Sequence, residues 1–201
     1  MIVVGLVGGI AAGKSTVMQQ LSKLGAAVID GDQVTRVLQR PGELGWAAIR
    51  QTFGPDYFLE NGELDRGKLA QLVFSDSKAL KKLNAVMFPL ITEFLERELT
   101  EVMARGTEMA VVEGAALYES GLLDMMDEVW LVRADPEVRR KRLMARNGYS
   151  DAEARMRMDA QISEAILERI ATRIIDSSDA SENSTWEQVQ KCYRDAVAKG
   201  K

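Results

Sequence analysis

The residues with the clearest chemistry lie near the start of the chain, in the run Gly8-Gly9-Ile10-Ala11-Ala12-Gly13-Lys14-Ser15-Thr16. This run matches the phosphate-binding pattern G-x-x-x-x-G-K-[ST] at every fixed position. Glycines let such a loop turn tightly, so that successive backbone N–H groups surround an anion. Lys14 can then reach the β- and γ-phosphates of a nucleoside triphosphate, and the Ser15 hydroxyl can hold Mg²⁺. The stretch therefore predicts nucleotide binding.

Elements that would position this loop flank it on both sides. The apolar, β-branched run 2–7 has the length of a strand buried on both faces. After the loop, Val17, Leu21 and Leu24 recur at helical spacing, and Gly25 follows as a stop signal. Strand, glycine-rich turn and helix are the context that the pattern requires. A glycine-rich turn with a chance Lys-Ser after it, the alternative, leaves these flanking elements unexplained.

Two carboxylates follow the second expected strand, 26–29. In open parallel sheets ligands bind beyond the carboxyl ends of the strands, and Asp30 and Asp32 lie at such an end. A kinase that acts on a hydroxyl needs a carboxylate to orient the acceptor, take its proton or help hold Mg²⁺. We assign that role to Asp32, with Asp30 as the second candidate. Alternatively, the pair forms a turn and an N-cap for a helix beginning near Gln33.

The strongest cluster of positive charge lies on a helix expected after the fourth strand, 128–132. Spacings of three and four residues put Arg139, Arg142 and Arg146 on one face of that helix. Triphosphate oxygens would separate these guanidinium groups, and an arginine there can stabilise the charge that develops during phosphoryl transfer. A solvated face paired with nearby carboxylates is the alternative.

The remaining pattern completes an α/β fold. Runs 109–112 and 173–176 are predicted strands. Glu113 directly follows the first, at a point where a carboxylate can lie near Mg²⁺ or its waters. Between 34 and 105 apolar residues recur at helical spacing without strands, which predicts an inserted helical lobe; Pro89 is expected to interrupt or begin a helix. The lobe either covers a sheet edge or binds the acceptor. Its candidate cations are Arg36, Arg66 and Lys68.

A turn and two short helices follow the arginine-rich helix. Asn147-Gly148 is a turn signal, and the run 150–153 resembles a capping box. Beside a nucleotide site, such helices predict a mobile lid that excludes water, because hydrolysis is the competing reaction. We therefore expect a single domain made of a core (about 1–33, 106–143 and 172–201), an acceptor lobe (about 34–105) and a lid (about 144–171).

Composition narrows the class of protein. The chain has 201 residues, 46% hydrophobic and 28% charged, which is typical of one globular domain. The formal net charge of −4 gives no general surface for nucleic acid or membrane. A lone cysteine, Cys192, excludes an internal disulfide and suits a reducing cytoplasm. The sequence has no histidine, so a general base must be a carboxylate.

Together, these motifs closely resemble one family, dephospho-coenzyme A kinase, over nearly the whole chain. The phosphate loop is common to many kinases, whereas the ordered set, above all Gly62-Glu63-Leu64-Asp65-Arg66, is far more specific. The other matching segments are 5–10 with 13–16, 28–32 followed by Arg36, 41–42, 53–54, 73–74, 89–91, Leu117-Tyr118-Glu119, Arg142 with Arg146, Gln161, and 175–176.

The resemblance implies an α/β fold of the P-loop NTPase type, a doubly wound five-stranded parallel sheet with the inserted lobe and the lid. It also implies Mg²⁺-dependent transfer of the ATP γ-phosphate to the ribose 3′-hydroxyl of dephospho-coenzyme A, in a cytoplasmic monomer or small homo-oligomer. The expected ATP site is Gly9, Ala11, Ala12, Gly13, Lys14, Ser15, Thr16, Arg142 and Arg146; the acceptor site is Asp32, Arg36, Arg66, Leu117, Glu119 and Gln161. Ser15 and Asp32 would hold Mg²⁺, and Asp32, Lys14 and Arg142 would be catalytic.

The sequence differs from the usual family pattern at several positions, and other functions are compatible with its motifs. The family usually has His-Pro at Phe88-Pro89 and Pro-Leu-Leu at Ala115-Ala116-Leu117, where the acceptor is expected. It usually has Asp-Asn at Asp176-Ser177 and Gly-Ser at Ala11-Ala12. Asp-Gly-Asp after the second strand also occurs in gluconate and adenylylsulfate kinases, which lack the segment 62–66. A nucleotide-dependent switch or a non-catalytic relative is the remaining alternative; each predicts no acceptor phosphorylation.

Overall fold

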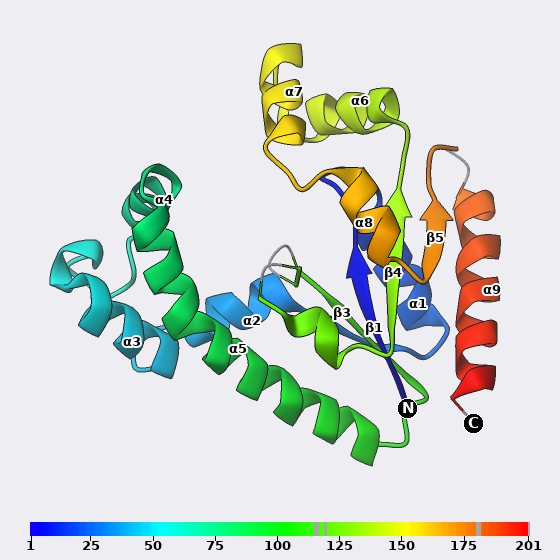
Figure 1. Cartoon of the computed structure of the whole chain (residues 1–201), viewed down its shortest axis with the longest axis horizontal. Helices are drawn as coiled ribbons and strands as arrows, with labels where there is room; N and C mark the ends of the chain where they lie inside the picture. Colours follow the sequence, from blue (N-terminus) through cyan, green and yellow to red (C-terminus); the bar gives the residue numbers. More distant parts are fainter. Residues whose placement is uncertain (115–116, 119, 180–181, 201) are drawn as a thin grey trace. The chain divides into compact units, whose positions relative to one another are not determined.

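A computed structural model of the chain describes residues 1–114, 117–118, 120–179 and 182–200. Within these residues lies a five-stranded sheet with the order β2-β3-β1-β4-β5 (Figure 1). The β1–β3, β1–β4 and β4–β5 pairs are parallel, as the doubly wound α/β fold requires. The strands are β1 (Ile2–Val7), β2 (Ala27–Asp30), β3 (Met109–Glu113), β4 (Glu128–Arg133) and β5 (Arg173–Asp176).

The central strand β1 leads directly to the phosphate-binding run. It is enclosed by β3 and β4, with Leu6 opposite Glu113 on one side and Trp130 on the other. Val4 and Leu6 are fully buried, which explains the unbroken apolar sequence of this strand. Parallel pairing brings the carboxyl ends of these strands to one edge of the sheet, where a ligand site is expected.

Helices cover both faces of the sheet. On one face, α1 (Lys14–Lys23) and α9 (Glu182–Lys199) pack against the strands, with Val17 and Val189 fully buried in a shared core. On the other face, Leu167 of α8 (Glu164–Ile170) packs with Val7, Val129 and Leu131. The apolar residues predicted to form the helix after the loop, Val17 and Leu21, are therefore core residues, as their spacing indicated.

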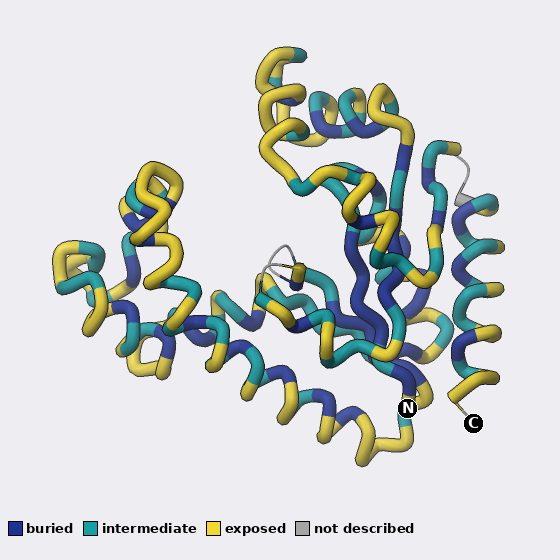
Figure 2. Tube along the Cα trace, in the orientation of Figure 1, coloured by how far each residue is buried: buried dark blue, intermediate teal, exposed yellow. Residues whose placement is uncertain are grey.

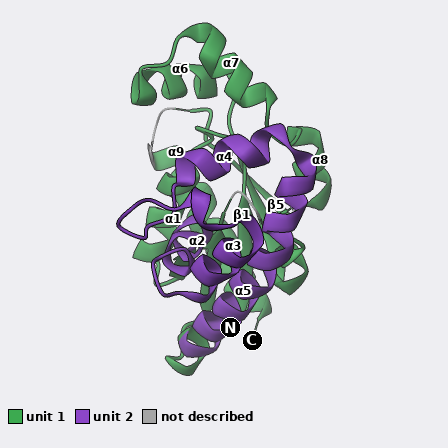
Figure 3. Ribbon diagram, turned by 90° about the vertical axis from the view of Figure 1, so that its left-hand side faces the viewer, with its two compact units in different colours: residues 1–29, 102–201 green, residues 30–101 purple. Residues whose placement is uncertain are grey.

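The chain forms two compact units, 1–29 with 102–201 and 30–101, coloured separately in Figure 3. The second unit is helical apart from an isolated bridge between Phe58 and Leu64. Gly54, with φ of 87°, ends one of its helices. Its elements are α2 (Gly31–Leu38), α3 (Leu44–Phe53), the 3₁₀ turn η1 (Pro55–Tyr57), α4 (Arg66–Ser75) and α5 (Ser77–Ala104, of which residues to 101 belong to this unit).

The prediction that Pro89 interrupts or begins a helix is wrong. Pro89 lies inside α5, which continues through it to Ala104. The buried residues Met87, Ile91 and Leu95 recur every four residues on both sides of the proline and make one continuous apolar face, visible as alternating colour along α5 in Figure 2. Burying each such side chain contributes about 1.5–3 kcal/mol, so the stripe outweighs the roughly 3 kcal/mol that an interior proline costs.

Two later helices begin at side-chain caps. Asp135 caps α6 (Pro136–Asn147), its side chain accepting a hydrogen bond of 2.8 Å from the Glu137 N–H. Ser150 and Glu153 form the expected capping box of α7 (Asp151–Asp159). A further 3₁₀ turn, η2, spans Leu122–Met125. Within the described part of the chain, no helix combines the length and apolar composition that a bilayer crossing needs.

Candidate active site

The phosphate loop connects β1 to the first turn of α1. Gly13 precedes the helix at φ 97°, in the left-handed region, and has no side chain that could bond the helix N–H groups. The first-turn donors and the positive end of the α1 dipole are thus directed at whatever anion the loop holds. Ala11 also adopts a left-handed conformation (φ 59°), a strained state of the kind found at functional sites.

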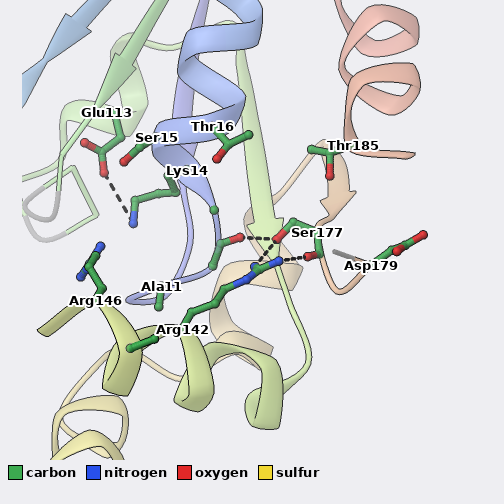
Figure 4. A pocket seen from close by; sticks show the side chains of 13 residues that line it. Ala11, Lys14, Ser15, Thr16, Glu113, Arg142, Arg146, Ser177, Asp179 and Thr185 are labelled. Atoms are coloured by element: carbon green, nitrogen blue, oxygen red, sulfur yellow. Dashed lines mark hydrogen bonds and ion pairs between the residues drawn. The ribbon is translucent and has the colours of Figure 1, made fainter. Parts of the chain in front are cut away.

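A cavity of about 650 Å³ opens over this loop, within the unit 1–29 with 102–201 (Figure 4). Its volume falls in the range of small-molecule sites. The six successive residues 11–16, which were predicted from the sequence to bind phosphates, all line it. Contributions from elsewhere in the chain are Glu113, Arg142, Ala145, Arg146, Ser177, Asp179 and Thr185.

The Lys14 ammonium is held inside the cavity by two oxygens. It donates a hydrogen bond of 3.0 Å to the Gly8 carbonyl and lies 3.5 Å from Glu113 Oε1. Glu113 is placed there by the sheet, because the last β3 residue pairs in register with Leu6, just before the loop. Figure 4 shows the carboxylate directed at the ammonium group. The lysine is therefore extended toward the space that a phosphate chain would fill.

Arg142 reaches the loop through Ser177, which follows β5. Its guanidinium donates to the Ser177 hydroxyl at 3.0 Å and to the Ser177 carbonyl at 2.7 Å. The same hydroxyl donates to the Ala12 carbonyl at 2.6 Å. Ser177 is 4% exposed, so this chain of hydrogen bonds is shielded from water and fixes the arginine relative to the loop (Figure 4).

The three arginines predicted on one helical face have different roles. Arg142 and Arg146 line the cavity, as the phosphate-binding interpretation expects. Arg139 instead pairs with Glu164 at 3.3 Å, as the alternative expects, but it is only 7% exposed and therefore not part of a solvated face. Phosphate binding by Arg142 and Arg146 stays a prediction. Helical spacing identifies the shared face but not the neighbour of each side chain.

A network of ion pairs holds Asp176, the residue directly before Ser177. Arg133, at the end of β4, bonds Asp176 Oδ2 at 3.1 Å and Glu168 of α8 at 3.0 Å. Hydrogen bonding from Ser178 and then the Arg133 charge lower the pKa of Asp176, while Asp176 and Glu168 raise the pKa of Arg133. The Asp176 carboxyl therefore stays ionised, and the turn that carries Ser177 is tied to β4 and, through Arg133, to α8.

Comparison with known proteins assigns the chain to a family. The sequence profile of the family described as dephospho-CoA kinase matches residues 2–183. A dephospho-CoA kinase of Moorella thermoacetica is 40% identical over 202 residues, which cover 97% of this chain and 95% of that protein. The chain belongs to the dephospho-CoA kinase family. Another member, from Geobacter sulfurreducens, is 40% identical over 200 residues, covering 98% of each chain.

Solved structures share the fold of this chain. The structure of TT1252 from Thermus thermophilus has a TM-score of 0.84 and 31% identity, covering 96% of each chain. A dephospho-CoA kinase from Campylobacter jejuni, 21% identical, has a TM-score of 0.70 and covers 99% of this chain and 98% of its own. At that identity the likeness shows the fold alone, and the fold is that of a P-loop kinase.

In this member of the dephospho-CoA kinase family, the two aspartates that follow β2 differ in their surroundings. Asp30 is the N-cap of α2: its side chain accepts from the Asp32 and Gln33 N–H groups at 2.9 and 3.0 Å. Asp32, in the first turn of that helix, is exposed. Capping was one of the two interpretations of the pair, and it holds for Asp30, although the helix begins at Gly31 rather than near Gln33. The Asp32 carboxylate takes no part in the cap.

The predicted acceptor residues are distributed over both units. Arg36 and Arg66 are exposed in the unit 30–101, and Arg66 donates to Gln39 at 3.2 Å. Leu117, only 2% exposed, and Gln161 belong to the other unit. Gln161 accepts a 2.6 Å hydrogen bond from the Ile10 N–H, in the phosphate loop. Glu119 lies outside the described residues, as do Ala115 and Ala116, where the sequence differs from the usual family pattern.

Four cavity residues were not predicted from the sequence. Ala145, Ser177, Asp179 and Thr185 line the cavity, and of these Ser177 makes the central contacts. A signal for it existed, because it directly follows a predicted strand, and polar groups at the carboxyl ends of parallel strands are ligand candidates. Beyond that position, nothing in the sequence around Ser177 indicates a role in the site. Its role emerges from its contact with Arg142.

Proposed function

We propose that the protein phosphorylates the ribose 3′-hydroxyl of dephospho-CoA, the last step of coenzyme A biosynthesis. The 3′-oxygen attacks the γ-phosphorus of ATP, the bond from that phosphorus to the β,γ-bridging oxygen breaks, and ADP leaves. Family membership supports the pair of substrates. The observation that carries the proposal is the cavity of about 650 Å³ whose floor is the phosphate loop and whose walls carry Lys14, Arg142 and Arg146.

Each phosphate-binding residue has a distinct part in this reaction. Residues 11–16, together with Gly9, hold the β- and γ-phosphates at the α1 N-terminus, through the backbone N–H groups that the loop does not itself use. The Ala12 and Thr16 N–H groups donate within the loop, to the Gly9 and Gly13 carbonyls. Lys14 and Arg142 neutralise the charge that spreads over the γ-phosphoryl oxygens in the transition state. Arg146, on the same side of α6 as Arg142, binds the outer part of the nucleotide phosphates. The exposed charge in the cavity thus matches a polyanion in a chain with a net charge of −4.

The donor set fits a Mg²⁺ ion that arrives with ATP. The described residues contain no cluster of three acidic, cysteine or histidine side chains that could hold a metal ion unaided. Mg²⁺ needs no such cluster, because it is usually held by substrate phosphates, waters and one or two protein groups. Ser15, exposed at the cavity, and Asp32 would supply those groups. When bound, the ion would offset negative charge on the β- and γ-phosphates.

Asp32 completes the reaction as the group that orients the acceptor hydroxyl and receives its proton. Its carboxylate is exposed, and it stands in the first turn of a helix whose cap is formed by its neighbour Asp30. The sequence has no histidine, so the proton must pass to a carboxylate or to the phosphate itself. Arg36, Arg66, Leu117, Glu119 and Gln161 are proposed to contact the acceptor, and α7 to act as the moving part of the lid. The enzyme works in the cytoplasm as a monomer or small homo-oligomer.

An acceptor panel tests the function. ADP release, measured by a coupled assay with dephospho-CoA, gluconate and adenylylsulfate, should depend on dephospho-CoA alone, with CoA identified by mass spectrometry as the product. Release of ADP with gluconate or adenylylsulfate only would reassign the acceptor. Nucleotide binding without phosphorylation of any acceptor would replace the kinase by a binding protein. A reaction without acceptor measures the competing hydrolysis and serves as the control.

A further inference from the structure

Arg139 is a buried charge that faces the outside of the phosphate loop. Its side chain is nearly enclosed, with 9% of it exposed, and it is not among the residues that line the nucleotide cavity. Its guanidinium donates from Nε to the Ile10 carbonyl at 3.0 Å, and through its two terminal nitrogens to Glu164 and Gln161, each at 3.3 Å. A charge this deeply buried is costly unless its donors are satisfied, and this one meets three acceptors.

The Ile10 residue is held on both of its backbone groups by side chains from outside the loop. Its carbonyl accepts from Arg139, and its N–H donates to Gln161 Oε1 at 2.6 Å. The same Gln161 oxygen also accepts from Arg139, so the three residues form a closed ring of hydrogen bonds. Gln161 precedes α8, and Glu164 begins it. The turn of the loop is therefore fixed by residues more than a hundred positions later in the chain.

Gly9 leaves the space that this arrangement occupies. A Cβ atom built on Gly9 would overlap the Arg139 guanidinium, whose planar group lies against the glycine backbone. Unlike Gly13, Gly9 has no left-handed conformation that would require glycine. The reason for glycine at this position is thus the close approach of the arginine. Any larger residue must push the guanidinium away from Ile10, Gln161 or both.

We propose that Arg139 is a positioning residue for ATP: it fixes the Gly9–Ile10 turn to the start of α8 and so keeps the loop N–H groups directed at the phosphates. The proposal rests on the proposed function only in taking ATP as the ligand. Arg139 touches no substrate itself. Without it the loop must be ordered by the nucleotide, and that cost appears as weaker ATP binding rather than as a slower chemical step.

Arg139→Ala and Arg139→Lys test the proposal by separating KM from kcat. We expect Arg139→Ala to raise the KM and Kd for ATP about tenfold, while kcat at saturating ATP and KM for the acceptor change less than about twofold. The ATP affinity of Arg139→Lys should lie between those of the wild type and Arg139→Ala. A lysine ammonium can contact one or two of the three acceptors, whereas the planar guanidinium contacts all three. Unchanged ATP affinity in both variants would overturn the proposal.

A matched control separates positioning from stability. Arg173 is also a largely buried arginine with a carboxylate partner, Glu128 at 2.5 Å, but it begins β5, at the end of the strands away from the loop. Arg173→Ala should lower the melting temperature by an amount comparable to Arg139→Ala and leave the Kd for ATP unchanged. If both variants weaken ATP binding in proportion to their loss of melting temperature, Arg139 is merely structural and the proposal fails.

The Gly9 contact provides a second, independent test. Gly9→Ala should weaken ATP binding by displacing Arg139, and the double variant Gly9→Ala with Arg139→Ala should bind ATP about as well as Arg139→Ala alone. Additive losses would show that Gly9 acts separately from Arg139 and would contradict the proposal. Calorimetric titration with a non-hydrolysable ATP analogue gives these affinities even if no acceptor is phosphorylated, so failure of the proposed acceptor leaves this test intact.

Discussion

Arg142 carries its charge into the cavity because Ser177 holds it at two points. The guanidinium bonds both oxygens of Ser177, and Ser177 in turn bonds the Ala12 carbonyl of the loop. Such preorganised donors cost no reorganisation when the phosphoryl group is transferred, and for that reason they contribute more to the transition state than flexible surface charges do. The single residue is effective only as part of this chain of contacts.

Arg142→Ala should therefore lower kcat about 10²-fold or more, since it removes a fixed positive charge from the transferring phosphoryl group. Arg142→Lys keeps the charge but cannot bond both Ser177 oxygens, so we expect it to recover only part of the activity. Steady-state kinetics at saturating ATP measures both. A fall in ATP affinity with kcat unchanged would show that Arg142 binds the ground state and does not stabilise the transition state.

Asp32→Asn tests the proposed base while preserving side-chain size. We expect ATP affinity to stay within about twofold of the wild type and turnover to fall about 10²-fold or more, because an amide cannot accept the acceptor proton. Isothermal titration with ATP and the coupled ADP assay provide the two measurements. Turnover equal to that of the wild type would remove Asp32 from the mechanism.

At the scale of the element, neighbouring aspartates divide two tasks. Asp30 closes the first turn of α2 by accepting from two backbone N–H groups, whereas Asp32 is exposed on that turn. The helix start at the carboxyl end of β2 thus leaves the second carboxylate, the proposed base, exposed. The stability of this short helix and the position of the proposed base depend on the same capping contact.

Asp30→Ala should lower the free energy of unfolding by about 1 kcal/mol, the usual cost of losing an N-cap. Asp30→Asn retains a side-chain oxygen acceptor and should cost less. Urea denaturation followed by circular dichroism measures both variants. Equal stability of Asp30→Ala and the wild type would contradict the capping role, and the Asp32→Asn variant, which keeps the cap, is the control.

At the scale of the whole molecule, most of the sheet could be predicted from the sequence. The runs 2–7 and 173–176 are strands with the predicted bounds, and 26–29 differs from β2 by one residue at each end. Strands buried on both faces have unbroken apolar runs, which makes them easy to locate. Local rules failed at Pro89, because the apolar face of α5 that overrides the proline depends on burial along the whole helix.

In the site, too, local features could be predicted from the sequence and contacts between distant residues could not. The phosphate loop was predictable because its chemistry lies in consecutive residues, and all of 11–16 line the cavity. Ser177 and Arg139 were not assigned their roles, because each acts through a residue far away in the chain, Ser177 through Arg142 and Arg139 through Ile10. Spacing within one helix cannot show which side chain from another segment it will meet.

The pH dependence of stability is also a property of the whole fold. A hydrogen bond from Arg173 lowers the pKa of Glu128 below its ordinary 4.5, and only 11% of the Glu128 side chain is exposed. Above that pH the carboxyl is ionised in both states, and its stabilisation is complete. As the pH falls below 4.5, the unfolded chain takes up the proton first, so the stabilisation is lost toward the lower pKa of the folded state.

Glu128→Gln should reduce the dependence of stability on pH below about pH 4.5, here called the acid limb. Near neutral pH it should lower the free energy of unfolding by about 3 kcal/mol, because Arg173 loses its main partner. Urea midpoints measured between about pH 3 and 6 give the slope for each protein. Parallel acid limbs would show that the pair does not control acid sensitivity. The Asp176 carboxyl, whose pKa is also lowered, titrates in both proteins and provides the common background.

The described ends of the chain lie together, because Met1, Val197 and Gly200 line one small cavity at the start of β1. The phosphate loop begins at the opposite end of that six-residue strand, roughly 20 Å away at about 3.3 Å per residue. A short peptide could therefore join the two ends, and circular permutants with new termini at an exposed site such as Glu60-Asn61 should fold and still bind ATP. Affinity tags or surface tethers attached at either end would leave the nucleotide entrance open.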